Sequence, residues 1–313
     1  MRTRWCLVCT AISAATSTLP AQSRFLDVPG ARIHYTVNGS GPAVVLIHGW
    51  ALDRREWTDQ IAALSPRYRV IAFDRRGFGK STGSADPSTE PADIRALLDT
   101  LHVRTAILVG HSAGAMVAQR FAAAMPERVE ALVLYGGPAP VGFPGVEPRQ
   151  QANDGGPGGG RGLIARQYGI DSVMRALDSR PQFRPGPNRT AAMAARIDSI
   201  TKDYPGRDLL DPKPQSGAFP PATLAQVRAW SFPILFVSGE AEAQPWLAMS
   251  DSLARWMSNA RRILVPGGGH GVHFDEPRRF NTALLEFLDS VTQRATRSPD
   301  RPWWRGAPDR TRR

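Results

Sequence analysis

The sequence predicts an α/β fold, with a mostly parallel β-sheet that carries helices on both faces and a helical insertion in the chain. Short apolar runs of strand type alternate with segments whose apolar residues recur at helical spacing. The run at 43–47 contains only apolar residues, as expected for a parallel strand that is covered on both sides. The alternation stops after residue 137 and resumes at residue 233, so the insertion is predicted to occupy 138–232.

Apolar runs predict the strands, which lie at 25–28, 33–37, 43–47, 68–73, 106–109, 131–135, 233–237 and 262–265. Apolar stripes at helical spacing predict helices at 56–64, 91–101, 116–125, 246–257 and 279–294. Because most strands are followed by a helix, consecutive strands are expected to run parallel, with the helices as crossovers. The core is therefore predicted to comprise residues 24–137 and 233–295.

The insertion differs in composition from the core. Helices are predicted at 163–178 and 190–201, and prolines break the chain between 205 and 221. A flexible loop is predicted at 153–162, where glycine is the most frequent residue. We interpret residues 138–232 as a helical cap over the C-terminal edge of the sheet.

The first 23 residues are predicted to be a secretory signal. Two arginines precede an apolar core at 5–15, and small residues at 19–21 offer a cleavage site. Both cysteines, Cys6 and Cys9, lie within this segment, so the mature chain would contain neither a disulfide nor a metal–thiolate site. The protein is therefore predicted to be secreted or periplasmic.

The formal net charge of +11 is concentrated near the ends of the chain. The last 20 residues contain seven arginines and two aspartates, and the signal adds two positive charges, which leaves +4 for the folded body. That value does not indicate a nucleic-acid partner. The tail at 296–313 is predicted to be disordered. No run outside the signal has transmembrane length, so no stable membrane insertion is expected after its removal.

The segment 106–125 predicts a strand, a tight turn and a helix, with Gly110-His-Ser-Ala-Gly114 at the turn. This is the G-x-S-x-G nucleophile elbow, which exposes a serine hydroxyl on a strained turn. The strand and helix pass so close together that only glycine fits two residues before and two after the serine. Ser112 is therefore the predicted nucleophile.

A serine hydroxyl needs a base to take its proton. The candidates are His34, His48, His102, His111, His270 and His273. His270 is favoured because it lies in a glycine-rich loop after the strand at 262–265, where the C-terminal strand ends share one edge with the elbow. His273 is the competing candidate, nearer the start of the last helix.

The acid of such a triad is expected between the serine and the histidine in the chain. The strand at 233–237 is followed by two carboxylates, Glu240 and Glu242. Glu242 is the first choice, and Glu240 remains the alternative.

Two backbone N–H groups are needed to hold the developing oxyanion. Ala113 supplies one at the start of the helix, and Trp50 supplies the other in the turn that follows the strand at 43–47. His48 is expected to hold this turn by hydrogen bonds.

Two other patterns are set aside. Residues 77–81 resemble a phosphate-binding loop, but the position that needs the first glycine is Asp74, which is expected to fix a turn instead. His270 and His273 lack a clustered carboxylate or cysteine partner in the sequence, so no metal site is predicted. No cofactor is expected.

The chain resembles the α/β-hydrolase fold superfamily over roughly residues 25–295. The matching segments are 48–50, 73–81, 110–114, 238–240 and 269–270. The resemblance is strongest to the group of small-molecule esterases, enol-lactonases, carbon–carbon bond hydrolases and cofactor-free haloperoxidases. It implies that the acid stands three residues after the glycine that ends its strand, which is Glu242 here. Serine at 112 argues against the epoxide-hydrolase and haloalkane-dehalogenase branches, which use aspartate there.

These residues predict a serine hydrolase that cleaves a small acyl substrate, a carboxylic ester or lactone, through an acyl-enzyme. Carbon–carbon or amide bond hydrolysis, cofactor-free haloperoxidase or perhydrolase activity, and ligand binding without catalysis stay open as alternatives, because function depends on the site rather than the fold. The oligomeric state does not follow from the sequence.

Overall fold

The computed structural model describes residues 23–137, 139–145, 159–178, 180, 183, 185–211 and 219–297. Three predictions fall wholly or mostly outside these residues: the signal at 1–23, the glycine-rich loop at 153–162 and the basic tail at 296–313.

The described chain is built around an eight-stranded sheet in the order β1-β2-β4-β3-β5-β6-β7-β8. The strands are β1 (Arg24–Val28), β2 (Ala31–Asn38), β3 (Ala43–Ile47), β4 (Arg69–Phe73), β5 (Ala106–His111), β6 (Val129–Tyr135), β7 (Ile234–Gly239) and β8 (Ala260–Val265). β2 pairs antiparallel with β1 and with β4, and all other neighbours are parallel. The prediction of a mostly parallel α/β sheet is confirmed.

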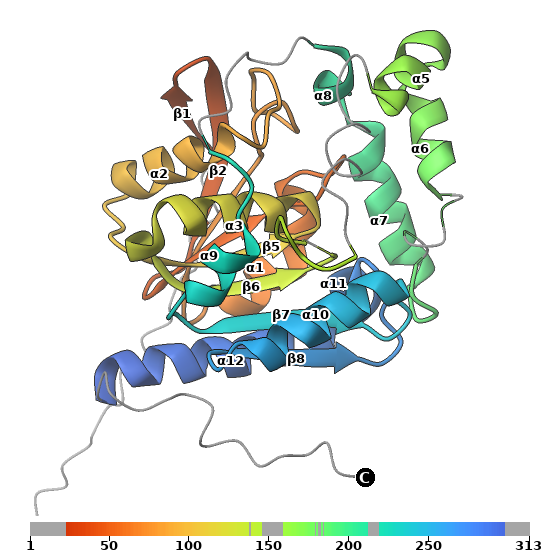
Figure 1. The fold of residues 1–313 in the computed structure, drawn as a ribbon. Coiled ribbons are helices and arrows are strands. Elements are labelled where there is room, and N and C mark those ends of the chain that lie inside the picture. The colour runs from red at the N-terminus through yellow and green to blue at the C-terminus, as the bar shows by residue number, and fades with distance from the viewer. Residues whose placement is uncertain are drawn as a thin grey trace, which may run out of the picture.

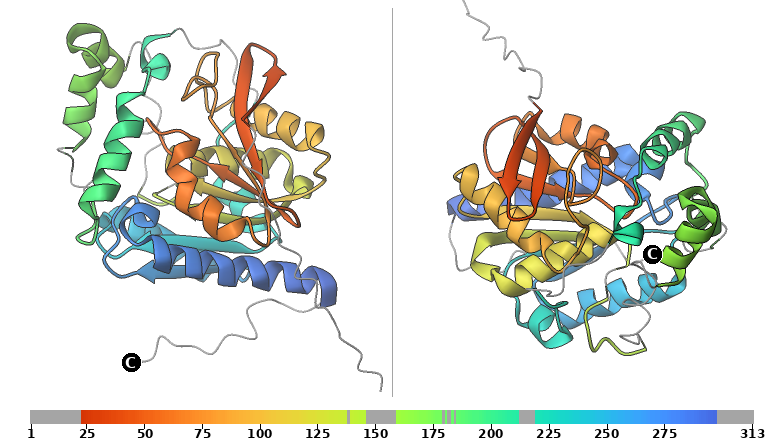
Figure 2. Two further views of the ribbon diagram at one scale, coloured as in Figure 1. Left: turned by 180° about the vertical axis from the view of Figure 1, so that it is seen from behind. Right: turned by 90° about the horizontal axis from the view of Figure 1, so that it is seen from above.

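Helices cover both faces of the sheet (Figures 1 and 2). One face packs against α2 (Glu90–Thr100), α3 (Ala113–Ala124), α9 (Leu224–Ala229) and α10 (Gln244–Trp256). The other packs against α1 (Thr58–Leu64), α11 (Val272–Asp275) and α12 (Pro277–Arg297). Strand β3 shows why this division arises, because Val45 and Ile47 point into the first core while Val44 and Leu46 point into the second. The α/β part of the chain also contains two short 3₁₀ helices, η1 (Arg54–Trp57) and η2 (Pro126–Arg128).

Four further helices lie together at one end of the molecule (Figure 1), namely α5 (Gly160–Tyr168), α6 (Ile170–Asp178), α7 (Ala191–Lys202) and α8 (Arg207–Leu210). The prediction of a single helix at 163–178 is wrong, because two helices, α5 and α6, occupy this segment. Gly169 has φ +81°, a left-handed conformation that ends α5 and lets α6 start in a new direction.

The last part of the insertion packs differently. Val227 of α9, with Trp230 and Phe232 after it, is buried in the same core as α3. Residues 222–232 therefore belong physically with the sheet, whereas α5–α8 form a separate group of helices.

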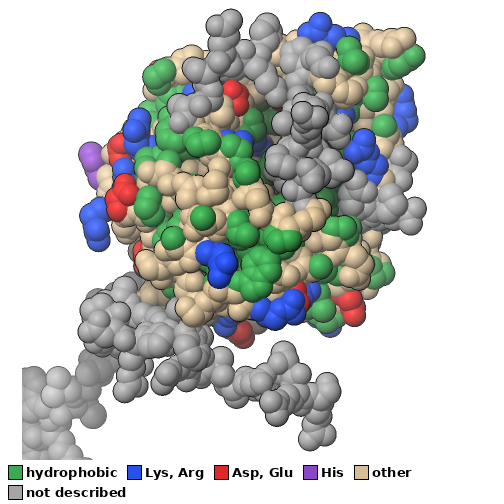
Figure 3. All heavy atoms as spheres, viewed as in Figure 1, with side chains coloured by type: hydrophobic (Ala, Val, Ile, Leu, Met, Phe, Trp, Pro, Cys, Tyr) green, Lys and Arg blue, Asp and Glu red, His purple; other side chains and the backbone are tan. Residues whose placement is uncertain are grey.

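No helix among the described residues is both long and apolar enough to cross a membrane. Figure 3 shows Lys and Arg side chains scattered over the viewed face among hydrophobic and acidic ones.

The parallel register brings the ends of five strands to one edge of the sheet. The aligned residues are Ile47 with Gly110, His111 with Tyr135, Tyr135 with Val237, and Gly239 with Val265. The segments that follow these ends contain every predicted site residue. The sheet thus gathers residues that are distant in sequence at a single edge.

Candidate active site

Ser112 occupies a strained turn between β5 and α3. Its backbone has φ 51° and ψ −114°, a conformation that a residue with a side chain rarely adopts. The turn is held by the Ser112 N–H, which donates to the Tyr135 carbonyl at 2.8 Å. The strain is of the kind expected for a nucleophile elbow.

Glycine is required on both sides of this turn. A Cβ at Gly110 would lie 2.6 Å from the Ala115 Cα, and a Cβ at Gly114 would lie 2.1 Å from the Ile47 carbonyl oxygen. Neither approach is possible for a real side chain, because the atoms nearest to each added Cβ belong to the backbone and cannot move aside as a flexible side chain can. The predicted steric reason for the motif therefore holds in the fold.

His270 reaches Ser112 from the loop that follows β8. Its Nε2 lies 3.2 Å from the Ser112 Oγ, and its Nδ1 lies 3.1 Å from the Glu242 Oε1. Gly136, with φ +81°, makes room for this ring, since a Cβ there would lie 3.1 Å from the His270 Cε1. The structure therefore brings Ser112, His270 and Glu242 into one chain of contacts.

The two alternative residues lie elsewhere. The carboxylate of Glu240 is exposed and accepts from the Gly267 N–H at 3.4 Å. His273 is fully buried, and its Nε2 lies 3.0 Å from Glu56 rather than near Ser112. Of the two histidines, His270 is the one that contacts Ser112, and of the two glutamates, Glu242 is the one that contacts His270.

Burial has the largest effect on the pKa values of Glu242 and His270. It raises the pKa of Glu242 to about 8, against a smaller lowering by Arg262. Burial also holds the pKa of His270 well below its usual range, with further lowering by the nearby His111. His270 is therefore a neutral imidazole at neutral pH, as a general base must be.

Aromatic side chains enclose the His270 ring. The Trp246 ring lies 4.8 Å away between centroids, and the Phe183 ring lies 5.1 Å away at a steep angle. Trp246 lies in the first turn of α10, whereas Phe183 belongs to the insertion. The sequence did not predict the contacts of Trp246 and Phe183 with His270, because aromatic side chains that cover a site have no fixed sequence distance from the residues they cover.

The turn at 48–50 packs against the elbow. His48 is buried, donates from Nδ1 to the Gly49 carbonyl at 2.7 Å, and accepts from the Arg75 N–H at Nε2 at 2.8 Å. Burial, followed by Arg75, lowers the pKa of His48, so the ring is neutral and suited to both contacts. His48 thus holds the turn, as predicted.

Ala113 and Trp50, the two predicted oxyanion donors, follow the ends of two neighbouring strands, β5 and β3. Ala113 is the first residue of α3, where helix geometry leaves the N–H without an intrahelical acceptor. Trp50 follows Gly49, and a Cβ at Gly49 would lie 2.8 Å from the His111 Nδ1. The turn at 48–50 therefore sits directly against the residue that precedes Ser112.

The Trp50 side chain contacts the separate group of helices. Its indole Nε1 donates to the Asp208 Oδ2 of α8 at 2.6 Å, and its ring lies 5.2 Å from that of Tyr204. Tyr204 also donates to Asp208. One residue thus joins the turn at 48–50 to the helices of the insertion.

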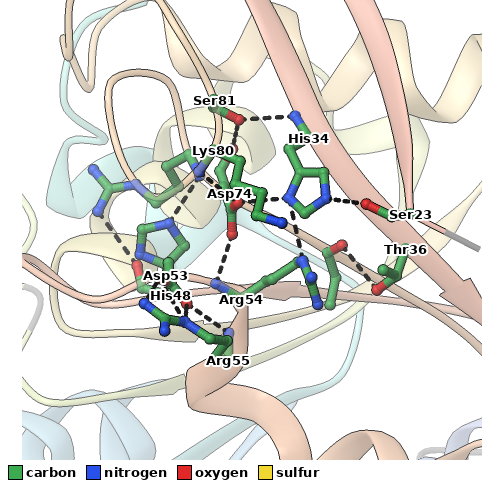
Figure 4. Close-up of polar contacts among 12 residues, drawn as sticks. Ser23, His34, Thr36, His48, Asp53, Arg54, Arg55, Asp74, Lys80 and Ser81 are labelled. Atoms are coloured by element: carbon green, nitrogen blue, oxygen red, sulfur yellow. Dashed lines mark hydrogen bonds and ion pairs between the residues drawn. The ribbon is translucent and has the colours of Figure 1, made fainter. Parts of the chain in front are cut away.

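The segment that resembles a phosphate loop is closed around Asp74 (Figure 4). The Asp74 carboxylate accepts from the N–H groups of Arg54 and Lys80, each at 2.9 Å, and from the His34 Nδ1 at 2.7 Å. The Lys80 amide is therefore already used within the protein, and Asp74 fixes the turn as predicted.

A second serine–histidine–aspartate chain appears at this turn (Figure 4). The Ser23 Oγ lies 2.5 Å from the His34 Nε2, which leads on to Asp74. Ser23 precedes an edge strand rather than a helix. It therefore has no helix N-terminus beside it, and it provides an internal control for Ser112.

A buried group that the sequence did not reveal lies beneath the elbow. Glu56, His111 and His273 approach one another closely, and none of the three exceeds 4% exposure. A glutamate directly before the buried Trp57 was the available signal, but its partners lie about 55 and 217 residues further along the chain.

Comparisons with known proteins agree with the fold described above. A model of the alpha/beta hydrolase family matches residues 44–283. An esterase from Thermogutta terrifontis is 24% identical with a TM-score of 0.69, over 87% of this chain and 99% of that one. An enol-lactonase from Burkholderia xenovorans LB400 is 24% identical with a TM-score of 0.68, over 85% and 99%. A bromoperoxidase from Bacillus anthracis is 25% identical with a TM-score of 0.67, over 86% and 100%.

Proposed function

The chain belongs to the alpha/beta hydrolase family, and we propose that it is a serine hydrolase that cleaves a carboxylic ester or lactone of a small acyl substrate. The observation that carries this proposal is the 3.2 Å contact between the Ser112 Oγ on its strained turn and the His270 Nε2. A hydroxyl so placed can lose its proton as it attacks a carbonyl carbon.

In the first half of the reaction, Ser112 attacks the carbonyl carbon and His270 takes the hydroxyl proton at Nε2. Glu242 accepts from Nδ1 and stabilises the imidazolium that forms. The N–H groups of Ala113 and Trp50 bind the oxyanion of the tetrahedral intermediate. His270 then protonates the leaving alkoxide, and an acyl-enzyme remains on Ser112.

In the second half, a water molecule takes the place of the alcohol. His270 removes a proton from this water, which attacks the acyl carbon, and the same two N–H groups hold the second oxyanion. Collapse of the intermediate releases the carboxylic acid and returns the proton to Ser112. Bond making and breaking balance without an oxidant, a metal or a cofactor.

Ser112→Ala, assayed on p-nitrophenyl acetate and butyrate, tests the proposal. We expect kcat to fall by about three orders of magnitude or more. Ser23→Ala, made like Ser112→Ala in the full-length chain that retains residues 1–23, is the matched control, because Ser23 also contacts a histidine–aspartate pair but lacks the elbow. Unchanged turnover in Ser112→Ala, or an equal loss in Ser23→Ala, would refute the assignment.

Perhydrolysis is a second candidate, favoured by the similarity to the Bacillus anthracis bromoperoxidase. Hydrogen peroxide would replace water as the acceptor of the acyl group, and a peracid would leave instead of an acid. Halogenation of monochlorodimedone that requires acetate, peroxide, bromide and Ser112 would support it.

The alternative of ligand binding without catalysis has a direct test. A fluorophosphonate labels a serine only where a base activates it. Labelling of the wild-type protein, but not of Ser112→Ala, supports the hydrolase, whereas an unlabelled folded wild-type protein would support binding alone.

We also propose that the protein is exported, because residues 1–23 combine a basic start, an apolar core and small residues near Ala21. N-terminal sequencing of protein recovered from the periplasm or medium would test this. A mature chain that begins near residue 22 is expected, and an intact Met1 would contradict export.

A further inference from the structure

One buried carboxylate contacts three segments of the proposed active site. Glu56 of η1 is fully buried, and its Oε2 accepts from the Gly49 N–H at 2.8 Å. Its Oε1 lies 2.6 Å from the His111 Nδ1 and 3.0 Å from the His273 Nε2. These partners come from the turn at 48–50, from β5 and from α11, so Glu56 is the point where three distant segments meet.

Each partner of Glu56 stands close in sequence to a group that the proposed reaction uses. Gly49 immediately precedes Trp50, His111 immediately precedes Ser112, and His273 follows His270 by three residues. A shift of Glu56 would therefore move one proposed oxyanion donor, the nucleophile and the base together.

The ionised form of Glu56 is stabilised inside this group. Burial alone would raise the pKa of Glu56, but His111 and then His273 outweigh it and hold that pKa well below its usual range. Burial lowers the pKa of His273 to about 4, so this ring is neutral at neutral pH. Glu56 is therefore a carboxylate, and its Oε1 lies nearer to the His111 Nδ1, at 2.6 Å, than to the His273 Nε2, at 3.0 Å.

The same three side chains could be thought to hold a metal ion, since their ligand atoms lie within 4.8 Å of one another. The geometry argues against it. Around a tetrahedral zinc ion, ligand atoms stand about 3.3 Å apart, whereas Glu56 Oε1 lies only 2.6 Å from His111. The other carboxylate oxygen, Oε2, already accepts a hydrogen bond from the Gly49 N–H.

The two imidazole contacts are short electrostatic contacts rather than well-aligned hydrogen bonds. They are short, yet Glu56 Oε1 and the imidazole nitrogens facing it fall outside hydrogen-bond geometry. The best-formed contact of the carboxylate is thus the one with the Gly49 N–H, which orients the turn that carries Trp50.

We propose that Glu56 is a positioning residue that holds the oxyanion turn at 48–50 against the nucleophile elbow and the loop of the base. The proposal rests on the serine hydrolase function proposed above. Because oxyanion contacts are made in the transition state and not with the ground-state ester, the loss of Glu56 should lower kcat much more than it raises KM.

Glu56→Gln is the first test, with p-nitrophenyl butyrate as substrate and a trifluoromethyl ketone as the oxyanion-forming inhibitor. Gln keeps an oxygen for Gly49 but removes the charge that orders the imidazoles. We expect kcat to fall about 100-fold, with KM within about threefold and inhibitor affinity reduced in proportion to kcat/KM.

Asp93→Asn is the matched control for loss of a buried carboxylate. Asp93 is as buried as Glu56 and is ion-paired at 2.6 Å, but its partner is Arg76, which also donates to the Pro29 carbonyl between β1 and β2. Asp93→Asn should lower the melting temperature while leaving kcat and the affinity for the ketone unchanged. An equal loss of kcat in both variants would reduce the role of Glu56 to general stability and overturn the proposal.

His273→Gln covers the case in which Glu56→Gln does not fold, because it leaves the carboxylate and its Gly49 contact in place. A loss of about tenfold in kcat is expected. Wild-type kcat in a folded Glu56→Gln, or in His273→Gln, would overturn the proposal. So would stoichiometric zinc in the purified protein together with loss of activity on chelation. These outcomes differ from a failure of the proposed function, in which the wild-type protein itself would be inactive.

Discussion

The Nε2 of His270 lies 3.2 Å from the Oγ of Ser112, although 158 residues separate them in the chain. The contact exists because β5 and β8 end at the same edge of a parallel sheet, and because Gly136 leaves space for the imidazole. The contact between Ser112 and His270 therefore depends on each of these segments, and substitutions in any of them can test it.

His270→Ala should reduce kcat about as much as Ser112→Ala, since the two side chains act as one unit. The double variant should then be no slower than either single variant. His273→Ala should lose far less, because His273 faces Glu56 instead of Ser112. Steady-state kinetics on p-nitrophenyl butyrate would show it, and additive losses at Ser112 and His270 would contradict the shared role.

The pH dependence of kcat/KM should follow Glu242. Burial raises the pKa of this carboxyl to about 8, so below pH 8 it is mostly protonated and cannot stabilise the imidazolium. The pKa of His270 is lowered well below its usual range, so this ring stays neutral over the same interval. We expect kcat/KM to rise with pH and level off above about 8. An acidic limb near the usual histidine pKa of about 6.5 would contradict this.

The same carboxyl should make the folded state less stable at higher pH. Between its ordinary pKa of 4.5 and its folded-state pKa of about 8, the folded protein binds a proton that the unfolded chain does not. Stability from this group is complete below pH 4.5 and is lost as pH rises to 8, by about 1.4 kcal/mol per pH unit. Urea unfolding at pH 5 and pH 8 should show a smaller decrease in Glu242→Gln than in the wild-type protein, and equal decreases would exclude this linkage.

Gly114→Ala should destabilise the fold by about 3 kcal/mol or more, because the new Cβ would lie 2.1 Å from the Ile47 carbonyl oxygen. Gly142→Ala separates this clash from backbone strain. Gly142 has φ +84° but nothing within 4 Å of an added Cβ, so its cost should be about 1 kcal/mol. Thermal unfolding of both variants measures the difference, and equal losses would mean that the close approach at the elbow is not limiting.

Trp50→Phe should affect KM more than kcat. The substitution removes the indole contact with Asp208 at 2.6 Å but keeps the backbone N–H that we assign to the oxyanion. Asp208→Ala should raise KM at least as much, because it removes the contact with Tyr204 as well, and adding Trp50→Phe to Asp208→Ala should cause no further loss. Kinetics on acetate and butyrate esters would test it, and a large drop in kcat in Trp50→Phe would show that the side chain does more than join the turn to α8.

The sequence alone determined the features that depend on local sterics and on strand order. The glycines at 110 and 114 identified the elbow, because only a strand–helix approach of that closeness requires them. The apolar runs at 43–47 and 131–135 identified parallel strands, and parallel strands place the ends that follow them at one edge. The sequence alone could therefore predict that Ser112, the turn at 48–50 and the loop of His270 belong to one site.

The tertiary structure decided which of several similar residues make contact. Glu242 and Glu240 lie two residues apart, and His270 and His273 lie three apart. Sequence spacing could not show which imidazole faces Ser112 or which carboxylate contacts that imidazole. The same limit hid Glu56, because its partners come from β5 and α11 and meet only in the packed core. The break at Gly169 and the packing of α9 against α3 also depend on contacts between distant segments. Local patterns fix the elements and their order, whereas the pairing of side chains is fixed only when those elements pack.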